Sequence, residues 1–221
     1  MALGVEDVKR ALNFNQPLLK IYETEKAILA AGTFVVSETA DAFGPVRKFD
    51  IECYFSKKYP ETEPLVVEVG GTIERTSDRH MYRNGVCCTC VWEEWLATST
   101  DTSVQAFCDG PLFNFFLSQT IYEQTGEWPF NERSHGAEGV AEAISCLLEL
   151  QLSTSQALSY IRVVAAKSIK GHIPCPCGSG ENLRDCHMDQ LIGLRKSINR
   201  NHAKALHLRL RKLLIAERGI T

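Results

Sequence analysis

The chain has 221 residues, of which 44% are apolar, and its formal net charge is −3. This length supports one medium domain with an appendage, and the apolar fraction is normal for a soluble globular protein. The small net charge gives no overall attraction to nucleic acid.

No apolar run approaches the roughly 18 residues needed to span a bilayer, and the N-terminus lacks a basic start followed by a long apolar run. We therefore expect a cytoplasmic protein with no membrane partner. There are nine cysteines, an odd number, and several are clustered. In a reducing compartment, clustered cysteines indicate metal binding or catalysis more often than disulfides.

Charge is unevenly distributed along the chain. Residues 188–221 contain eight Lys and Arg against two Asp and Glu, a net charge of +6, so the preceding residues carry −9. A basic tail on an acidic body indicates an anionic partner or a docking contact, although a solvated helix face is commoner. Nucleic acid is therefore an open but less favoured partner.

The N-terminal part of the sequence predicts one helix followed by a three-stranded antiparallel meander. The helix is expected from about residue 4 to residue 31, with a break at Gln16-Pro17. Alternating or β-branched patterns predict strands at residues 33–38, 47–55 and 65–69.

The rest of the chain predicts mainly helices. The first is expected after a capping segment at residues 99–103. The others are expected from about residue 111 to 121 and at residues 140–152, 155–169 and 189–218. The run that starts near residue 111 is apolar nearly all round and is expected in the core. The last segment is basic and amphipathic, as one helix or a helix pair. Together these elements predict an α+β fold.

A cluster near the C-terminus has the spacing of a metal site. The candidate ligands are Cys175, Cys177, Cys186 and His187. Gly178 and Gly180 let the chain fold back between the first pair and the second. Zinc prefers four such ligands in a tetrahedron. The spacing C-x-C-x8-C-H and the Pro-Cys-Gly-Ser-Gly core resemble the SEC-C motif, so zinc is the expected cofactor. This small module occurs in many proteins and names no function.

A second cysteine cluster lies at residues 80–95, together with two of the three tryptophans. Asn84-Gly85 favours a tight turn, which would bring Cys88 to the surface at the rim of a cleft. A thiol is a nucleophile only as a thiolate, and it needs partial exposure and a positive or hydrogen-bonding neighbour such as His80 or Arg83. Burial is the commoner fate of cysteine, so this cluster alone favours a structural role.

The order of motifs in the first 140 residues resembles the ubiquitin-conjugating enzyme family. In that family a Tyr-Pro-x-x-x-Pro connector precedes a histidine, then a glycine three residues before the catalytic cysteine, and then a tryptophan. The matching residues are Tyr59, Pro60, Pro64, His80, Gly85, Cys88 and Trp95. The loop at residues 128–136 looks like the bacterial branch of the family, which is found in CBASS antiphage operons.

The resemblance implies that Cys88 is the catalytic nucleophile of a transferase. Cys88 would accept a C-terminal carboxyl group as a thioester and pass it to an amine or another acceptor. Counting from Gly85 favours Cys88, whereas counting back from Trp95 favours Cys87. We prefer Cys88, and we expect Cys90 to be structural.

The resemblance also implies roles for other residues near this cysteine in the sequence. Tyr82 replaces the asparagine of the family's His-Pro-Asn, which helps to hold the oxyanion, and Asn84 is a candidate substitute. His80 and His135 are candidate proton carriers, although a structural role is commoner for histidine. Tyr82 and Arg83 are candidates to line the groove for the incoming C-terminal tail.

We therefore expect a ubiquitin-conjugating-like domain at residues 1–135. A helical extension is expected at residues 136–221, with the SEC-C zinc motif at 172–190 and a basic C-terminal helix. The resemblance implies a protein donor with a free C-terminus, a cGAS-like nucleotidyltransferase. The acceptor is not indicated. The sequence has no glycine-rich nucleotide loop, so either a separate activating enzyme or a mechanism that bypasses one is expected.

The alternative is a binding module without activity. It would be a scaffold of the same fold, or a zinc-dependent module that binds protein or nucleic acid. The missing asparagine favours this alternative, and the retained spacing from Gly85 to Cys88 favours the enzyme.

Overall fold

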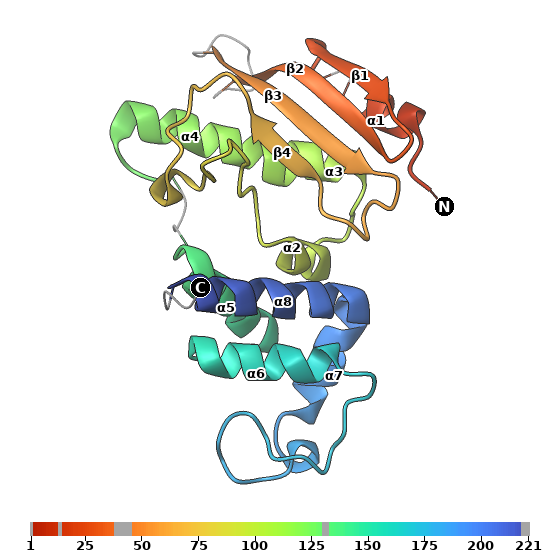
Figure 1. Cartoon of the computed structure of the whole chain (residues 1–221), viewed down its shortest axis with the longest axis vertical. Coiled ribbons are helices and arrows are strands. Elements are labelled where there is room, and N and C mark those ends of the chain that lie inside the picture. The colour runs from red at the N-terminus through yellow and green to blue at the C-terminus, as the bar shows by residue number, and fades with distance from the viewer. Residues whose placement is uncertain (1, 13–14, 38–45, 130–132, 218–221) are drawn as a thin grey trace. The chain divides into compact units, whose positions relative to one another are not determined.

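The computed structural model describes residues 2–12, 15–37, 46–129 and 133–217. The chain divides into two compact units (Figure 1). Unit 1 comprises Met1–Cys90 and Thr100–Glu132, and unit 2 comprises Val91–Ser99 and Arg133–Thr221. The sequence predicted a boundary at residue 135, with residues 91–99 in the first domain, whereas the structure groups these residues with unit 2. The assignment of residues 1–135 to a ubiquitin-conjugating-like domain stays a prediction. The predicted α+β class is confirmed.

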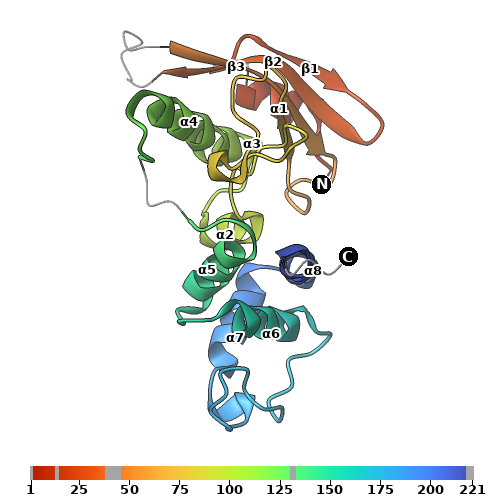
Figure 2. The same ribbon diagram turned by 60° about the vertical axis from the view of Figure 1, so that its left-hand side comes forward.

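Unit 1 contains an antiparallel sheet with helices on one of its faces (Figures 1 and 2). After α1 (Val5–Leu12), four strands follow as a meander: β1 (Leu19–Glu23), β2 (Ala27–Ser37), β3 (Val46–Ser56) and β4 (Leu65–Glu68). The short η1 (Ser77–Arg79) comes next. The later helical run consists of α3 (Val104–Phe107), the π-helical turn η2 (Cys108–Leu112) and α4 (Phe113–Thr125). Ser103, at the end of the predicted capping segment, caps this run by accepting from the Ala106 N–H.

The meander has four strands, whereas the sequence predicted three. The helix predicted from residue 4 to residue 31 ends at Leu12, so the prediction is wrong beyond this point. Strands β1 and β2 pair instead, joined by a turn in which the Thr24 hydroxyl bonds both backbone groups of Ala27. The alanines and leucine of β2 are good helix formers, but the burial of alternate residues against the core outweighs that propensity.

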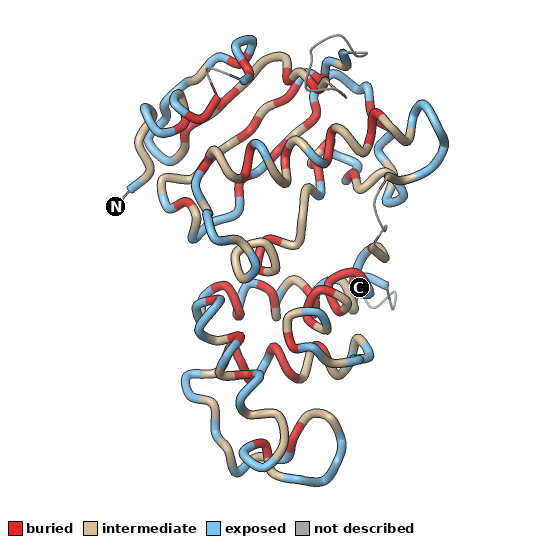
Figure 3. Tube along the Cα trace, turned by 180° about the vertical axis from the view of Figure 1, so that it is seen from behind, coloured by how far each residue is buried: buried red, intermediate tan, exposed pale blue. Residues whose placement is uncertain are grey.

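One face of the sheet carries the aromatic core of unit 1. Every second residue of β3 from Phe49 to Phe55 is buried, as the alternating sequence predicted, and Figure 3 shows the buried positions along the strands. The Phe116 ring of α4 lies 5.2 Å from the Phe34 ring and 4.7 Å from the Phe49 ring, measured between centroids. These contacts anchor α4 on the sheet.

Unit 2 is helical. Its elements are α2 (Trp92–Thr98), α5 (Gly136–Leu148), α6 (Thr154–Ala165), η3 (Leu183–Asp185), α7 (Met188–Ser197) and α8 (Arg200–Glu217). The predicted helices at residues 140–152 and 155–169 are present as α5 and α6, and the basic C-terminal segment forms two helices. In the described part of the chain, no helix is both long enough and apolar enough to cross a bilayer.

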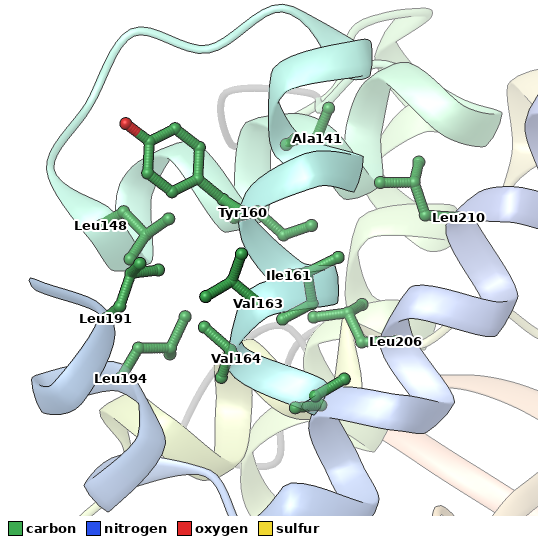
Figure 4. Packing of buried hydrophobic residues seen from close by; sticks show 14 of the residues in the cluster. Ala141, Leu148, Tyr160, Ile161, Val163, Val164, Leu191, Leu194, Leu206 and Leu210 are labelled. Atoms are coloured by element: carbon green, nitrogen blue, oxygen red, sulfur yellow. The ribbon is translucent and has the colours of Figure 1, made fainter. Parts of the chain in front are cut away.

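Apolar side chains from α5, α6, α7 and α8 form one core (Figure 4). Its fully buried members include Tyr160, Ile161, Val164, Leu191 and Leu206. Truncating one of its large aliphatic side chains to alanine is expected to cost about 2–5 kcal/mol. The side chain of Glu93 in α2 is 1% exposed and accepts from Arg209 of α8 over 2.7 Å, so this buried charge is paired.

Candidate functional site

A short hairpin in unit 2 brings the four predicted metal ligands together. The Cys175 N–H donates to the Glu181 carbonyl over 2.9 Å, so the two arms of the loop pair. Gly178 and Gly180 lie at its end with φ of 85° and 84°, a conformation that favours glycine. The chain folds back here as predicted, and η3 and α7 then bring the second ligand pair beside the first.

The ligand atoms converge on one point. Those of Cys175, Cys177, Cys186 and His187 all lie within 4.8 Å of one another. His187 Nδ1 is 3.3 Å from Cys175 Sγ and 3.0 Å from Cys186 Sγ. A tetrahedral ion with bonds of about 2.0–2.3 Å holds such atoms roughly 3.5–3.8 Å apart. The chain therefore contains a Cys3His group able to hold a metal ion.

Hydrogen-bond donors beside Cys177 favour its thiolate form, which is the form that binds a metal. The Ser179 hydroxyl oxygen lies 3.2 Å from Cys177 Sγ, and the Ser179 N–H donates to that sulfur over 3.4 Å. The Ser179 hydroxyl and N–H lower the pKa of Cys177 to about 6. The cluster also directly precedes the N-terminus of α7, where backbone N–H groups stabilise negative charge.

Helix α6 contributes two side chains that contact this loop. Tyr160 is fully buried, and its Oη lies 3.7 Å from Cys175 Sγ and 3.2 Å from His187 Nδ1. Gln156, one turn earlier, donates from Nε2 to the Cys177 carbonyl over 3.4 Å. Burial raises the pKa of the Tyr160 hydroxyl, which keeps it protonated. Motif spacing did not identify either residue, because both lie far from the ligands in the sequence, within an amphipathic helix.

The second cysteine cluster lies on a small hairpin in unit 1. The Cys88 N–H donates to the His80 carbonyl over 2.9 Å, which closes the hairpin. Gly85 lies at its turn with φ of 85°, and a Cβ there would be 2.8 Å from the Glu68 carbonyl oxygen. The turn predicted at Asn84-Gly85 is therefore present, and it requires glycine.

The three cysteines of this hairpin have different surroundings. Cys88 is exposed, Cys90 is partly exposed, and Cys87 is 7% exposed. Burial raises the pKa of Cys87 to about 12, so its thiol is protonated at neutral pH. Adjacent residues of an extended chain point to opposite sides, which explains the contrast between Cys87 and Cys88. Solvent therefore reaches Cys88 far more readily than Cys87.

Helix α4 restrains the segment before this hairpin. Gln119 is fully buried; its side chain accepts from Arg79 Nε and donates to the Arg79 carbonyl, each over 2.8 Å. The Arg79 guanidinium also lies 3.5 Å from the Glu123 carboxylate. His80 follows directly, and its carbonyl receives the Cys88 N–H. The sequence showed Gln119 only as one polar residue in an apolar helix, so this role was not predicted.

The two candidate histidines belong to different units. The His80 ring packs edge-on against Trp128 in unit 1, with ring centroids 5.5 Å apart. His135 belongs to unit 2, where it directly precedes α5. A role for either one in proton transfer stays a prediction. Residues 130–132, in the loop that resembles the bacterial branch, lie outside the described residues.

The remaining candidates lie at the turn itself. The Asn84 side chain accepts from the Val86 N–H over 3.3 Å, so this oxygen is used within the turn. Tyr82 and Arg83 are exposed. Their predicted role in binding a C-terminal tail stays a prediction.

The comparisons with known proteins concern the metal site. The family model described as SEC-C motif matches residues 173–189, which include all four ligands. No curated protein and no solved structure matches the chain. The predicted SEC-C motif is therefore confirmed, and the match names no family for the rest of the chain.

Proposed function

We propose that the protein is a cysteine-dependent acyl transferase, similar to the ubiquitin-conjugating enzymes, with Cys88 as its nucleophile. One observation carries this proposal. Cys88 is exposed and its N–H donates to the His80 carbonyl, whereas the adjacent Cys87 is buried and protonated. A nucleophile that receives a large protein donor must be accessible and held in place. The order of helix, meander and cysteine hairpin is consistent with the resemblance.

The proposed reaction has two steps. The Cys88 thiolate attacks the activated carbonyl carbon of a partner's C-terminus, a thioester bond forms, and the activating group leaves. An amine of the acceptor then attacks the thioester, an amide bond forms, the amine loses a proton, and Cys88 leaves as a thiolate. The candidate oxyanion donors are the Asn84 side-chain N–H groups and backbone N–H groups near Asn84. Only the oxygen of the Asn84 amide is used within the turn, whereas the Cys88 N–H donates to the His80 carbonyl.

The proposed donor is the C-terminus of a cGAS-like nucleotidyltransferase of a bacterial antiphage operon. Its support is the resemblance of the first 140 residues, and it implies a cytoplasmic protein. A separate activating enzyme supplies the activated carboxyl group. The acceptor is a protein amine or another nucleophile.

The proposed ion in the Cys3His group is zinc. Three thiolates and one imidazole suit zinc, whereas calcium and magnesium prefer oxygen ligands. Four protein ligands complete a tetrahedron and leave no position for a reacting water, which is typical of a structural site. The metal therefore holds the hairpin against α7 and supplies no step of the transfer.

The test of the transferase is non-reducing mass spectrometry of the chain co-expressed with its operon neighbours. Wild type is compared with Cys88→Ser and, as the matched control, Cys87→Ser. We expect a thiol-sensitive mass adduct in wild type and in Cys87→Ser. In Cys88→Ser the adduct is expected to be absent or to become a thiol-stable ester. The mass of the adduct identifies the donor.

The other outcomes favour different accounts. An adduct lost only in Cys87→Ser would make Cys87 the nucleophile. No adduct in any sample, with the neighbours shown to be present, would favour the scaffold. The observation that favours the scaffold is Tyr82 at the position of the family's asparagine, because the oxyanion then lacks the family's side-chain donor.

A further inference from the structure

The metal hairpin is attached to one face of α6. Gln156 and Tyr160 are four residues apart, so their side chains project from the same side of the helix. Gln156 contacts the hairpin at the Cys177 carbonyl, and Tyr160 contacts it at Cys175 and His187. All three residues of the hairpin lie within the confirmed motif, whereas neither residue of α6 does.

Tyr160 belongs to the apolar core as well as to the metal site. Its ring is fully buried among the apolar side chains of unit 2 (Figure 4). The same cluster includes Cys175 and Leu183. A buried hydroxyl needs a hydrogen-bond acceptor, and the two acceptors recorded for it in the described structure are Cys175 Sγ and His187 Nδ1. When His187 Nδ1 binds a metal ion, its lone pair is used. Cys175 Sγ then remains as the acceptor.

We propose that Tyr160 is a positioning residue of the metal centre, whose hydroxyl donates to the Cys175 thiolate and couples metal binding to the packing of α6. This inference rests on the proposed zinc binding. Donation to a metal-bound thiolate orients the sulfur and disperses its negative charge. Loss of such an outer partner typically lowers metal affinity about 10–100-fold. Gln156 reaches only a backbone carbonyl, so its contribution is smaller.

The test compares wild type with Tyr160→Phe, which keeps the ring and removes the oxygen. The zinc affinity of the full chain is measured by competition with a chelator. The thiolate-to-metal charge-transfer absorption is recorded with Co²⁺ in place of zinc. The matched control is Tyr54→Phe in unit 1, which removes a hydroxyl bonded to Glu52. We expect about 10-fold weaker zinc binding and a shifted Co²⁺ band in Tyr160→Phe, and neither change in the control.

Equal affinity and an unchanged Co²⁺ spectrum in Tyr160→Phe would overturn this inference and leave zinc binding intact. A wild type with well under one zinc per chain would overturn zinc binding, and the role of Tyr160 with it. If Tyr160→Phe does not fold, fluorine NMR of wild type containing fluorotyrosine measures whether metal removal changes the surroundings of Tyr160. Five of the six tyrosines belong to unit 1, so metal removal should shift one resonance, and no shift would overturn the proposal.

Discussion

The hairpins of unit 1 and unit 2 both present cysteines beside a turn that contains glycine, but they arrange the sulfurs differently. In unit 2 three sulfurs and one imidazole nitrogen lie within 4.8 Å of one another. In unit 1 Cys87 is buried and Cys88 is exposed. Backbone conformation accounts for part of the difference. Adjacent residues of an extended chain point to opposite sides, as Cys87 and Cys88 do, whereas the adjacent ligands Cys186 and His187 lie in a non-extended segment between η3 and α7. Cysteine content alone therefore does not separate a metal site from a candidate nucleophile.

The largest predicted contrast is in thiol reactivity within unit 1. In Cys88→Ser treated with iodoacetamide at pH 8, Cys87 should react on the order of 10³-fold more slowly than an ordinary exposed thiol, since a pKa of about 12 leaves little thiolate. Peptide mass spectrometry over a time course measures the rate. Cys146, which is exposed on α5, is the internal control. Equal rates for Cys87 and Cys146 would contradict the burial of Cys87.

The raised pKa of Cys87 also predicts the sign of a pH effect on stability. Its folded pKa of about 12 lies above the ordinary value of 9.0, so unfolding releases the proton more easily. The contribution of Cys87 to stability is therefore complete below pH 9 and is lost as the pH rises toward 12. Urea unfolding of wild type and Cys87→Ala between about pH 8 and pH 11 measures this. The free energy of unfolding of wild type should fall relative to that of Cys87→Ala as the pH rises, and a constant difference would contradict the prediction.

The second largest effect concerns the convergent sulfurs of unit 2. Cys186→Ser removes a thiolate ligand and should weaken metal binding by more than the roughly 10–100-fold that is typical of an outer partner. Chelator competition measures the affinity, with Cys146→Ser as a control for loss of an exposed thiol. Unchanged affinity in Cys186→Ser would mean that this sulfur is not a ligand.

The third prediction concerns the restraint on the Cys88 backbone. Gln119→Leu leaves the Arg79 side chain and carbonyl without their buried partner, and we expect a loss of about 1–3 kcal/mol in the free energy of unfolding. Amide hydrogen exchange at Cys88 should also become faster, because its acceptor on His80 is less restrained. The control is Gln124→Leu, which makes the same substitution at an exposed position near the end of α4. Equal losses of stability in the two variants would contradict this role of Gln119.

The smallest predicted effect is a difference in the stability lost when alanine replaces a glycine in each of the two turns. Gly85→Ala and Gly178→Ala both place alanine at a φ of 85°, which costs about 1–2 kcal/mol. At Gly85 the new Cβ would also lie 2.8 Å from a backbone oxygen, whereas at Gly178 it would meet nothing within 4 Å. Urea denaturation should therefore show the larger loss for Gly85→Ala. The reverse order would contradict the described packing of the unit 1 turn.

The sequence predicted much of this structure where local patterns dominate. The alternation in β3, a cap within residues 99–103 and the convergence of the four metal ligands are each confirmed. These features depend on residues that are close to one another in the chain, so a local sequence pattern is enough to predict them.

The sequence did not predict features that depend on distant contacts. Strand β1 and the first part of β2 were expected to be helical, because their pairing and burial are tertiary effects. Tyr160 and Gln119 were read as members of helices, and their hydrogen-bond partners lie far from them in the chain. The proposed transferase activity rests on a resemblance in the order of motifs from Tyr59 to Trp95.

The most direct test of this account is alkylation of the full native chain with and without a zinc chelator, followed by peptide mass spectrometry. Cys88 and the exposed Cys146 should be modified in both samples. The sulfurs expected to react only after chelation are those of Cys175, Cys177 and Cys186. The buried thiols expected to stay unmodified are Cys53, Cys87 and Cys108. Protection of Cys88 equal to that of Cys87, or reaction of the three ligand sulfurs before chelation, would contradict the account.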